Sequence, residues 1–544
     1  MDGKPEPRHT EVLIAGTGPA GCTFARFLAP HKQVWMVEAG GHLSKRAGAH
    51  LKNSFVYQRD VNKFTPIVQG LLQQISVPPR TNIATALDPI AYPQSAGSIR
   101  SAMNPRQDPY RNLEAAAVSY AVGGMLTHWT NNTPRHHPTL EMIPFIPGGD
   151  WNVLYPYAEA LLNAHTDVFE HSVRNTLVKK ALSDYYRNEL PAAYPVQNLP
   201  VAGERLKQND ELVHYSASDT ILGNLADQPP SDRFQILPQH RVKKLVKKKG
   251  KFEYAVVEDL INWKTYHVYA DIVIVAAGAV MTPQILWNSH IRPYALGRYL
   301  FEHPMTFTQI VLKKEIVDSI MEVEEIQSDE VSRRRLAGRS PNDPIPIPMN
   351  DPPPMVWIPV CEAVSQKRLW HCQIHRDSFS YGAVPPDIDD RLIVDLRWFG
   401  MVDPVPSNLV RFEEDLNDKF GMPQPTFEYT LGEDDRRRAH DMMSDMVDAA
   451  QALGGFLPGS EPRFMPPGTS LHLQGTSRMG EKNDGTCITD SFSKVWEYDN
   501  VYLGGNGLIP TRNASNPTLT TVALATRAAH KILGVVPQSP PVLP

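Results

Sequence analysis

Thr10-Glu-Val-Leu-Ile-Ala-Gly-Thr-Gly-Pro-Ala-Gly21 is the most informative stretch of the chain for its architecture. A short apolar strand leads through a GxGxxG turn into a helix that we expect over residues 19–28. In such a turn Gly16 permits the tight bend, Gly18 lets the backbone approach a pyrophosphate, and Gly21 allows helix and strand to pack closely. The helix N-terminus then faces the phosphates, so the stretch predicts a nucleotide-binding βαβ opening.

The next strand supplies a second part of this site. We expect it over residues 33–38, and it ends in Glu38, 20 residues past Gly18. A carboxylate in this position accepts hydrogen bonds from a ribose diol and repels a 2′-phosphate. The glycine pattern alone is a weak signal, because it also occurs where a strand–helix turn is merely tight. Together with Glu38 it favours a dinucleotide.

The composition is that of a globular protein with more than one lobe. The 544 residues are 42% hydrophobic and 21% charged, and this length exceeds a single hydrophobic core. The formal net charge of -5 provides no overall field for nucleic acid or an anionic membrane. The longest apolar run, residues 272–277, is far shorter than the ~18 residues of a membrane span. We therefore expect neither a nucleic-acid partner nor a membrane partner.

Several longer segments differ in pattern. Residues 55–112 show no sustained period, which is typical of an arm, a lid or an insertion. Residues 328–354 are rich in charge and proline and predict an extended surface excursion. Residues 391–398 alternate as a strand does, and residues 433–453 have helical spacing with methionines that suit core packing better than a cofactor site. Residues 517–533 predict a helix with proline at its start.

The basic run at residues 241–251 is a local exception to the charge balance. Its apolar positions and those of residues 252–257 predict two strands joined by a basic turn. We therefore expect a solvated hairpin, with a polyanion site as the alternative.

The N-terminus and the cysteines bear on the compartment. Residues 1–10 are polar and lack the apolar core of a secretory signal. The four cysteines are scattered without a CxxC motif or a disulfide ladder, which suits a reducing interior. Glycosylation sequons at Asn131 and Asn513 adjoin the motifs discussed next, where a glycan would obstruct the site. We expect an intracellular or unconventionally exported protein.

Three motifs bear the chemistry: Ala121-Val-Gly-Gly-Met-Leu-Thr-His-Trp-Thr130, Leu471-His-Leu-Gln-Gly-Thr-Ser-Arg-Met-Gly480 and Asn516-Pro-Thr-Leu-Thr520. A histidine in a glycine-rich turn is a place where a flavin could be covalently captured. A polarised alcohol must lose a proton while its carbon surrenders a hydride, and a neutral imidazole is the natural base. An asparagine can contact the same hydroxyl without changing its own charge.

Each of these residues also has a purely structural interpretation. His128 could simply be packed in its loop, and His472 could be a buried histidine without a reacting partner. Asn516 could cap the helix that begins at residue 517.

The motifs resemble the pyranose 2-oxidase family of the glucose-methanol-choline (GMC) flavoenzyme superfamily. The resemblance extends to a strand-turn-helix at residues 271–286, which includes Gly278, and to a closing strand at residues 500–506, which ends in Asn506. It covers nearly the whole chain. It implies FAD as the cofactor, because a nicotinamide dehydrogenase would not need these segments.

The resemblance also implies roles at the flavin. Gly123 and Gly124 would let the backbone approach the isoalloxazine, and His128 would form an 8α-histidyl covalent bond to FAD. Thr130 would lie near N5 and O4 of the ring. Attachment to the ring tends to raise the flavin potential.

The same family implies the base and the sugar pocket. His472 would be the base and Asn516 its partner. Residues 373–383 resemble a mobile substrate loop, which commonly gates access. The pocket residues implied are Gln373, Asp377, Phe379, Ser380, Tyr381 and Arg397, and the alternative for residues 380–382 is an ordinary turn.

Departures from the family pattern occur near these motifs. Gln474 and Ser477 replace residues that are usual in the base motif, and Asn131 and Asn132 follow the attachment loop. The region after Glu302-His-Pro304 is compact for a full head domain. Because of these departures, the resemblance does not define the sugar preference, the oxygen reactivity or the surface partners of this chain.

We expect an α/β fold in which a Rossmann-like FAD-binding domain of the glutathione-reductase type joins an α+β, sheet-plus-helix substrate-binding domain. Three strand-like runs in residues 234–278 suit the β-meander of such an FAD domain. The expected divisions are residues 1–55, 113–150, 230–305 and 470–544 for FAD, 56–112 for an oligomerisation arm, and 151–229 and 306–469 for substrate, with a surface excursion near 315–355.

The resulting functional hypothesis is an FAD-dependent sugar oxidase. It would oxidise an aldopyranose of the D-glucose type at C2 to a 2-keto sugar and reduce O2 to H2O2, as a homotetramer without a metal ion. One alternative is the same half-reaction on a modified sugar or glycoside, or with a quinone acceptor. Another is a flavoprotein retained only as a binding partner.

Overall fold

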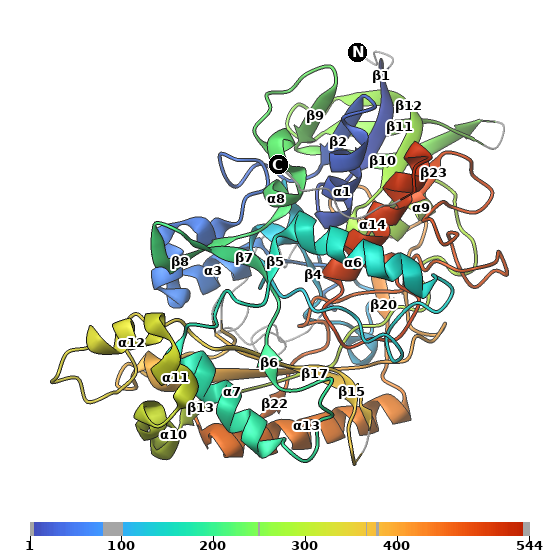
Figure 1. The fold of residues 1–544 in the computed structure, drawn as a ribbon. Coiled ribbons are helices and arrows are strands. Elements are labelled where there is room, and N and C mark those ends of the chain that lie inside the picture. Colours follow the sequence, from blue (N-terminus) through green and yellow to red (C-terminus); the bar gives the residue numbers. More distant parts are fainter. Residues whose placement is uncertain (1–4, 80–101, 249–250, 366, 377–379, 537–544) are drawn as a thin grey trace.

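Two sheets, each covered by helices, form the two lobes of the chain (Figure 1). The computed structural model describes residues 5–79, 102–248, 251–365, 367–376 and 380–536. In Figure 1 the sheet built on β1 and β2 lies at the top, and the sheet built on β13 and β17 lies below it. The mixed α/β architecture expected from the sequence is thus confirmed.

The first sheet is centred on β1 (Glu6–Ala15), which pairs in parallel with β2 (Val34–Glu38) and β12 (Thr265–Val275). The strand β2 pairs in parallel with β9 (Phe234–Pro238). The last residues of β1 are fully buried, as in parallel sheets that are covered on both faces. The carboxyl ends of these strands therefore meet at one edge of the sheet.

A meander extends this sheet on the far side of β12. The strand β10 (His240–Lys248) pairs antiparallel with β11 (Lys251–Asp259), which pairs with the first half of β12. The second half of β12 pairs in parallel with β23 (Val501–Leu503). The hairpin predicted for the basic run is confirmed, but residues 234–275 hold four strands, one more than the sequence suggested.

Helices cover one face of this sheet. The helix α1 (Pro19–Leu28) packs on α14 (Thr518–Leu533), which packs on α6 (Gly148–Leu162). Close approach of α1 requires glycine, because a Cβ at Gly21 would lie 2.1 Å from the carbonyl oxygen of Gly16. Gly16 itself has φ +107°, a left-handed conformation that favours glycine.

The second sheet is antiparallel throughout and follows the order β21-β13-β18-β17-β14-β6. A further strand, β22, pairs with β13. The bounds are β13 (Met305–Leu312), β18 (Ile393–Gly400), β17 (Trp370–His375), β14 (Met355–Ile358), β6 (Gln197–Asn198), β21 (Gly454–Phe456) and β22 (Arg463–Phe464).

Side-chain alternation gives this sheet two different faces. Trp370 and Trp398 share an apolar cluster with buried methionines of α13 (Glu433–Leu453) and with α7 (Val173–Tyr185). The methionines of α13 are thus core residues, as predicted. Neighbouring positions point to the opposite face, where Gln373 is in register with Arg397. This second face is directed toward the nucleotide-binding lobe.

Two segments contain more helix than the sequence pattern indicated. Residues 55–71 form α2 (Phe55–Arg59) and α3 (Val61–Leu71), whose Val68 lies on the cavity described below. The expected surface excursion contains α12 (Glu330–Ala337). Phe64 and Val68 of α3 are buried, and Leu336 of α12 packs against the apolar cluster of the second lobe, so tertiary contacts stabilise these short helices. Part of the predicted arm, residues 80–101, lies outside the described residues.

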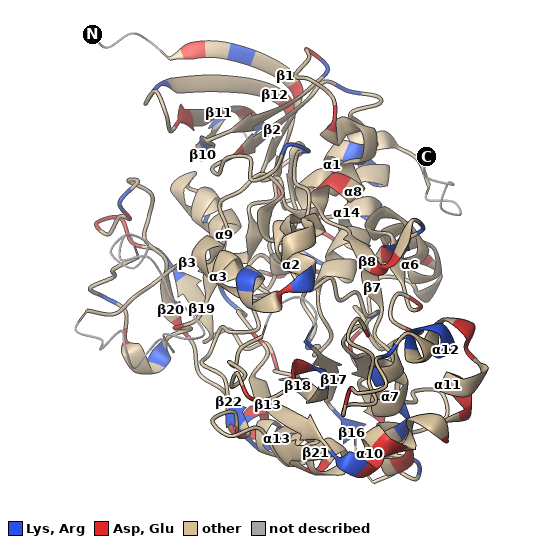
Figure 2. Ribbon diagram, turned by 90° about the vertical axis from the view of Figure 1, so that its left-hand side faces the viewer, with Lys and Arg blue, Asp and Glu red and all other residues tan. Residues whose placement is uncertain are grey.

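Short elements complete both lobes. They are β3 (Gln73–Gln74), β4 (Ala117–Val118), β5 (Ala164–His165), β7 (Val201–Leu206), β8 (Asn209–Tyr215), α8 (Ser218–Leu222), α9 (Gly278–Asn288), α10 (Lys314–Asp318), α11 (Glu324–Ser328), β15 (Cys361–Glu362), β16 (Lys367–Arg368), β19 (Leu409–Arg411) and β20 (Thr426–Glu428). Figure 2 shows acidic and basic residues interspersed on the ribbon, most densely on α10 to α12. Among the described residues no helix is both long and apolar enough to span a membrane.

Candidate active site

A cavity of about 490 Å³ lies at the carboxyl edge of the first sheet and reaches the second sheet. Its volume falls within the roughly 300–1,000 Å³ of ordinary ligand sites. The first lobe contributes the β1–α1 turn, the end of β2 and the start of α9. The second sheet contributes Gln373, Arg397 and Phe399. The cavity therefore joins the predicted nucleotide site to the predicted sugar site.

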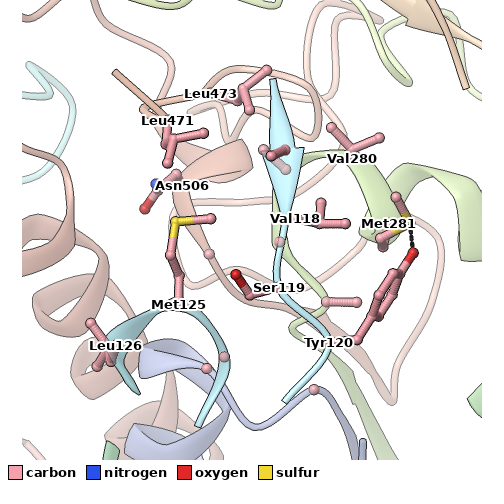
Figure 3. Close-up of a pocket in the computed structure, with 18 of the residues that line it drawn as sticks. Val118, Ser119, Tyr120, Met125, Leu126, Val280, Met281, Leu471, Leu473 and Asn506 are labelled. Atoms are coloured by element: carbon pink, nitrogen blue, oxygen red, sulfur yellow. Dashed lines mark hydrogen bonds between the residues drawn. The ribbon is translucent and has the colours of Figure 1, made fainter. Parts of the chain in front are cut away.

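One wall of the cavity is mainly apolar (Figure 3). The strand β4 crosses the view, with Leu471 and Met125 on one side of it and Tyr120 and Met281 on the other. The Tyr120 hydroxyl lies 3.9 Å from the Met281 sulfur. An apolar wall of this kind can cover the flat face of an aromatic ligand.

The β1–α1 turn leaves space for a ligand at one glycine. A Cβ at Gly18 would meet no atom within 4 Å, whereas one at Gly16 would lie 2.4 Å from the carbonyl oxygen of Ala276. No side chain caps the N-terminus of α1, so its first amides are not used by a cap. Gly18 therefore borders an open cradle, and Gly16 closes the turn behind it.

Glu38 stands at the same edge, at the end of β2. Its carboxylate accepts hydrogen bonds from the amide and hydroxyl of Thr17, at 3.2 and 2.8 Å, and from the amide of Gly40 at 3.0 Å. Burial raises the pKa of this carboxyl group. Glu38 thus supports the glycine turn as well as facing the cavity.

The two glycines of the motif at residues 121–130 differ in position. Gly124 lines the cavity, and a Cβ there would lie 3.1 Å from the Cα of Gly18. Gly123 does not line it, and its amide donates to the Thr17 hydroxyl at 3.0 Å. Both have positive φ, at 102° and 57°. The turn therefore packs directly against the nucleotide turn.

His128 lies on the cavity wall, with a hydroxyl group near each ring nitrogen. The Thr127 hydroxyl lies 2.9 Å from both the carbonyl oxygen of Gly124 and His128 Nδ1. On the other side of the ring, Nε2 lies 3.1 Å from the Ser119 hydroxyl. Burial lowers the pKa of His128 to about 4, which keeps the imidazole neutral at pH 7.

His472 and Asn516 meet at the other end of the cavity. Asn516 Nδ2 lies 3.1 Å from His472 Nε2, and both side chains line the cavity. Burial and the neighbouring His303 and His371 hold the pKa of His472 well below its usual value. His472 is therefore a neutral imidazole beside a neutral amide.

Backbone strain and a buried carboxyl group position His472. Leu471 has φ +59°, a left-handed conformation that costs a bulky residue about 1–3 kcal/mol. The next amide, that of His472, donates to Glu302 at 3.0 Å. Burial raises the pKa of Glu302 to about 7. These interactions fix the backbone from which the His472 ring projects.

The segment that leads to Asn516 is held by Glu141, which is 1% exposed. Its carboxylate accepts from the amides of Ala514 and Ser515, at 2.7 and 2.9 Å, and from the Ser515 hydroxyl at 2.9 Å. Three charge-assisted hydrogen bonds on consecutive residues leave the segment little freedom. Asn516 is therefore presented from a rigid loop.

The Asn516 side chain belongs to a chain of amides. Gln373 Nε2 donates to Asn516 Oδ1, and Asn132 Nδ2 donates to Gln373 Oε1 at 2.7 Å. Asn132 Nδ2 also lies 3.1 Å from the Thr130 hydroxyl. Asn132, a departure from the family pattern, thus links the flavin side of the cavity to its sugar side.

The predicted sugar residues divide into three groups. Tyr381 and Arg397 line the cavity, and the Arg397 guanidinium lies 5.1 Å from the centre of the Tyr381 ring. Ser380 does not line it, because its hydroxyl donates to buried Asp395 at 2.7 Å. Asp377 and Phe379 lie outside the described residues.

Most of the residues selected from the sequence share this one cavity. Those that line it are Gly16, Gly18, Glu38, Gly124, His128, Thr130, Gly278, Gln373, Tyr381, Arg397, His472, Asn506 and Asn516. Gly21, Gly123 and Ser380 support it from behind.

Sequence reasoning did not select Ser119, Glu141, His303 or Phe399. The ring of Phe399 lies 5.4 Å from that of His472, and the strand alternation that included Arg397 could have indicated it. Glu141 and His303 form hydrogen bonds with distant segments, and Ser119 contacts His128 nine residues along the chain. None of these contacts has a local signal in the sequence.

A profile of the GMC oxidoreductase family matches residues 404–525. The chain is 38% identical to a pyranose 2-oxidase of Lyophyllum shimeji over 97% of its own length and 92% of that protein. The chain belongs to the pyranose 2-oxidase family of GMC oxidoreductases.

Two further proteins are similar to the chain at lower sequence identity. A C-glycoside 3-oxidase of Arthrobacter globiformis is 32% identical over 98% of this chain and 96% of that protein. The solved structure of a pyridoxine 4-oxidase from Mesorbium loti has a TM-score of 0.64 at 15% identity, covering 97% of this chain and 99% of that one. At that identity the structure supports the shared fold alone.

As a GMC oxidoreductase the chain is a flavoprotein, and FAD is its cofactor. The cavity fits that group: the open space at Gly18 and the uncapped amides of α1 would hold the pyrophosphate. Glu38 would hold the ribose, and His128 and Thr130 would border the flavin. When bound, FAD supplies the hydride acceptor.

Replacing Gly18 by Ala should prevent FAD binding without unfolding the chain. The added methyl group meets no protein atom within 4 Å, and the φ of −70° suits alanine, but the methyl group enters the phosphate cradle. The flavin-to-protein ratio of the purified variant and its far-ultraviolet circular dichroism test this.

Gly70→Ala is the matched control, because a Cβ there also meets no atom within 4 Å and Gly70 lies in α3, off the phosphate cradle. It should retain FAD. A Gly18→Ala variant that purifies with a full complement of FAD would contradict the assignment of the cradle.

Proposed function

We propose that the chain is an FAD-dependent pyranose oxidase, which oxidises an aldopyranose such as D-glucose at C2 to the 2-keto sugar and reduces O2 to H2O2. The observation that supports it most is the neutral pair of His472 and Asn516, 3.1 Å apart on a cavity shared with the nucleotide turn. Relatives named pyranose 2-oxidase match nearly the whole chain.

His472 is the proposed base. Its Nε2 accepts from Asn516 Nδ2, so the lone pair needed for a hydroxyl proton lies toward Asn516. The sugar hydroxyl gives its proton to Nε2 while the C2 hydrogen leaves with its bonding electrons. Asn516 remains neutral throughout and orients the hydroxyl beside the imidazole.

Sugar recognition is proposed for the second sheet. Arg397 is 2% exposed and offers planar donors, while Tyr381 offers a ring face to the sugar. Gln373 acts through Asn516, since its amide already donates to Asn516 Oδ1. By family resemblance, Asp377 and Phe379 would complete the pocket.

The covalent link to FAD is proposed at His128 Nε2. When Thr127 donates its single hydroxyl proton to the Gly124 carbonyl, Nδ1 donates to Thr127 and Nε2 carries the lone pair. The ring lines the cavity and is neutral at pH 7, because burial lowers the pKa of His128 to about 4. Ser119 holds Nε2 through its hydroxyl at 3.1 Å. A neutral nitrogen lone pair is the nucleophile that attachment at the flavin 8α position requires.

Acid precipitation tests the link. The wild-type pellet should stay yellow, whereas His128→Ala should release all its flavin into the supernatant while still binding FAD. Asn516→Ala is a suitable comparison, because it alters the cavity without removing the attachment nitrogen. A colourless wild-type pellet would mean that FAD is held noncovalently.

Replacing His472 by Ala should slow anaerobic flavin reduction by aldoses by a factor on the order of 10²–10⁴, the usual contribution of a positioned base. Asn516→Ala should have a smaller effect, because it removes an orienting hydrogen bond of about 1–3 kcal/mol. Reoxidation of the chemically reduced variants by O2 should change less. If stopped-flow bleaching by glucose is unchanged in His472→Ala, the base is assigned wrongly.

The pH profile of this step should be flat across neutral pH. Burial holds the pKa of His472 well below its usual value, so the base stays unprotonated at pH 6.5 and above. The reduction rate should fall only at more acidic pH, where the imidazole gains a proton. A decline beginning above pH 6.5 in stopped-flow traces would show that another group controls the step.

A second candidate is oxidation of a glycoside or another modified sugar, or the use of a quinone as acceptor. The 32% identity to a C-glycoside 3-oxidase along nearly the whole chain supports it. Peroxide and quinone assays with free sugars and C-glycosides distinguish the candidates, and the position of the new ketone separates C2 from C3 oxidation.

We further propose a homotetramer built on residues 56–112. The exposed aromatic side chains of Phe55, just before this segment, and Tyr110, near its end, are 56% and 92% exposed and favour apolar contacts with another copy. Light scattering should then give about four times the chain mass of 60.8 kDa, and the monomer mass would contradict the proposal.

For the compartment, we propose that the protein is intracellular or unconventionally exported. Both sequon asparagines, Asn131 and Asn513, are 0% exposed, so a glycan added before folding would block the native packing. The four cysteines are free and buried. A glycan detected on the native chain by mass spectrometry would contradict this proposal.

A further inference from the structure

The far side of the His472 ring faces a second histidine. His472 Nδ1 lies 3.1 Å from His303 Nδ1, and the two rings cross at 72° with their centres 5.0 Å apart. His303 is 1% exposed and does not line the cavity. It therefore contacts the base from behind, out of reach of a sugar or a flavin.

The proton positions in this pair follow from one backbone carbonyl. Asn513 Nδ2 lies 3.0 Å from the carbonyl oxygen of Thr511, which can only accept a hydrogen bond. This contact orients the Asn513 amide and leaves its Oδ1 facing His303 Nε2 at 3.0 Å. Because Oδ1 can only accept, the proton of His303 is on Nε2.

Gln474 fixes this arrangement from the other side. Asn513 Nδ2 donates to Gln474 Oε1 at 2.9 Å, and Gln474 Nε2 donates to Asn513 Oδ1 at 3.1 Å. Gln474 Nε2 and His303 Nε2 lie 3.1 Å apart and share Asn513 Oδ1 as their acceptor. Gln474, another departure from the family motif, thus completes a reciprocal amide pair behind His303.

The protonation of His472 then follows. Burial lowers the pKa of His303 to about 3, so His303 is neutral and its Nδ1 has a lone pair. Two lone pairs 3.1 Å apart would repel, so His472 Nδ1 must carry the proton that fills the contact. The lone pair of neutral His472 is thereby assigned to Nε2, the nitrogen beside Asn516.

We propose that His303, oriented by Asn513 and Gln474, is a positioning residue that sets the tautomer of His472 and so directs its basic nitrogen toward the substrate alcohol. The kinetic consequence rests on the proposed function. When Nε2 takes the hydroxyl proton, the Nδ1 proton stays in place and His303 remains its acceptor. The hydrogen that leaves carbon as a hydride goes to the bound cofactor, so charge and electrons balance.

His303→Leu and His303→Asn test this in the full-length holoenzyme. Leucine removes the acceptor, whereas the asparagine Oδ1 can occupy the place of His303 Nδ1 and accept again. In a serine protease, removal of the group that orients the catalytic histidine tautomer costs about 10⁴-fold. We expect His303→Leu to slow flavin reduction by about 10²-fold or more, and His303→Asn to recover at least about tenfold of that loss.

His371→Leu is the matched control. His371 is 0% exposed and lies close enough to His472 to lower its pKa, but its Nδ1 accepts from Trp357 Nε1 at 3.2 Å rather than contacting a ring nitrogen of His472. This variant should slow reduction far less than His303→Leu. Equal losses of flavin-reduction rate in the two variants would overturn the proposal, because the effect would then come from removing any buried histidine near His472.

A direct reading of the tautomer separates this proposal from the proposed activity. Nitrogen-15 NMR of histidine-labelled holoenzyme, with His472→Asn to assign the signals, should show Nδ1 protonated and Nε2 unprotonated in His472. In His303→Leu both tautomers should appear. A wild-type chain that oxidises no sugar would end the proposed function but not this inference, whereas a proton on His472 Nε2 in the neutral wild-type ring would overturn the inference.

Discussion

The close contact between Gly16 and the backbone of Ala276 is the constraint on which the site depends. A side chain at Gly16 would come within 2.4 Å of the Ala276 carbonyl, so only glycine lets β1 and β12 end side by side. This contact brings the carboxyl ends of the parallel strands to one edge, where open α/β sheets bind their ligands. The motif at residues 121–130 then packs on the same turn through Gly124. A change at Gly16 would therefore disturb the whole nucleotide end of the cavity.

The reacting end of the cavity contrasts with sites that place a carboxylate beside the base. Neutral amides and imidazoles contact the ring nitrogens of His472, and Glu302 reaches only its backbone amide. Burial lowers the pKa of His128, His303 and His472, so protonated forms are unfavourable before substrate arrives. In such a site the positions of the imidazole protons depend on which way the side-chain amides point. The backbone carbonyl of Thr511 orients the Asn513 amide, which through His303 can determine which nitrogen of His472 is basic.

The fold tolerates extensive sequence change, and the cavity-lining face of the second sheet is separate from its apolar face. The chain shares its fold with a pyridoxine 4-oxidase structure at 15% identity over 97% of its length, so this fold tolerates extensive sequence change. The second sheet lines the cavity with the face that bears Gln373, Arg397 and Phe399, where we propose that the sugar binds. Strand alternation keeps this face independent of the apolar face packed on α13. Substrate preference can therefore change without disturbing the core.

The sequence by itself determined the βαβ opening, the helix over residues 433–453 and the identities of His128, His472 and Asn516 as candidates, because these depend on local periodicity and short motifs. It also identified Gln474 and Asn132 as departures, without a reason for them. Only the tertiary structure showed that Gln474 holds His303 through Asn513, and that Asn132 orients Gln373. The hydrogen bonds of His303 to Asn513 and of Asn132 to Gln373 join residues more than 200 positions apart, and even that of Gln474 to Asn513 spans 39. Such contacts leave no periodic trace in a sequence, since their partners meet only in the folded chain.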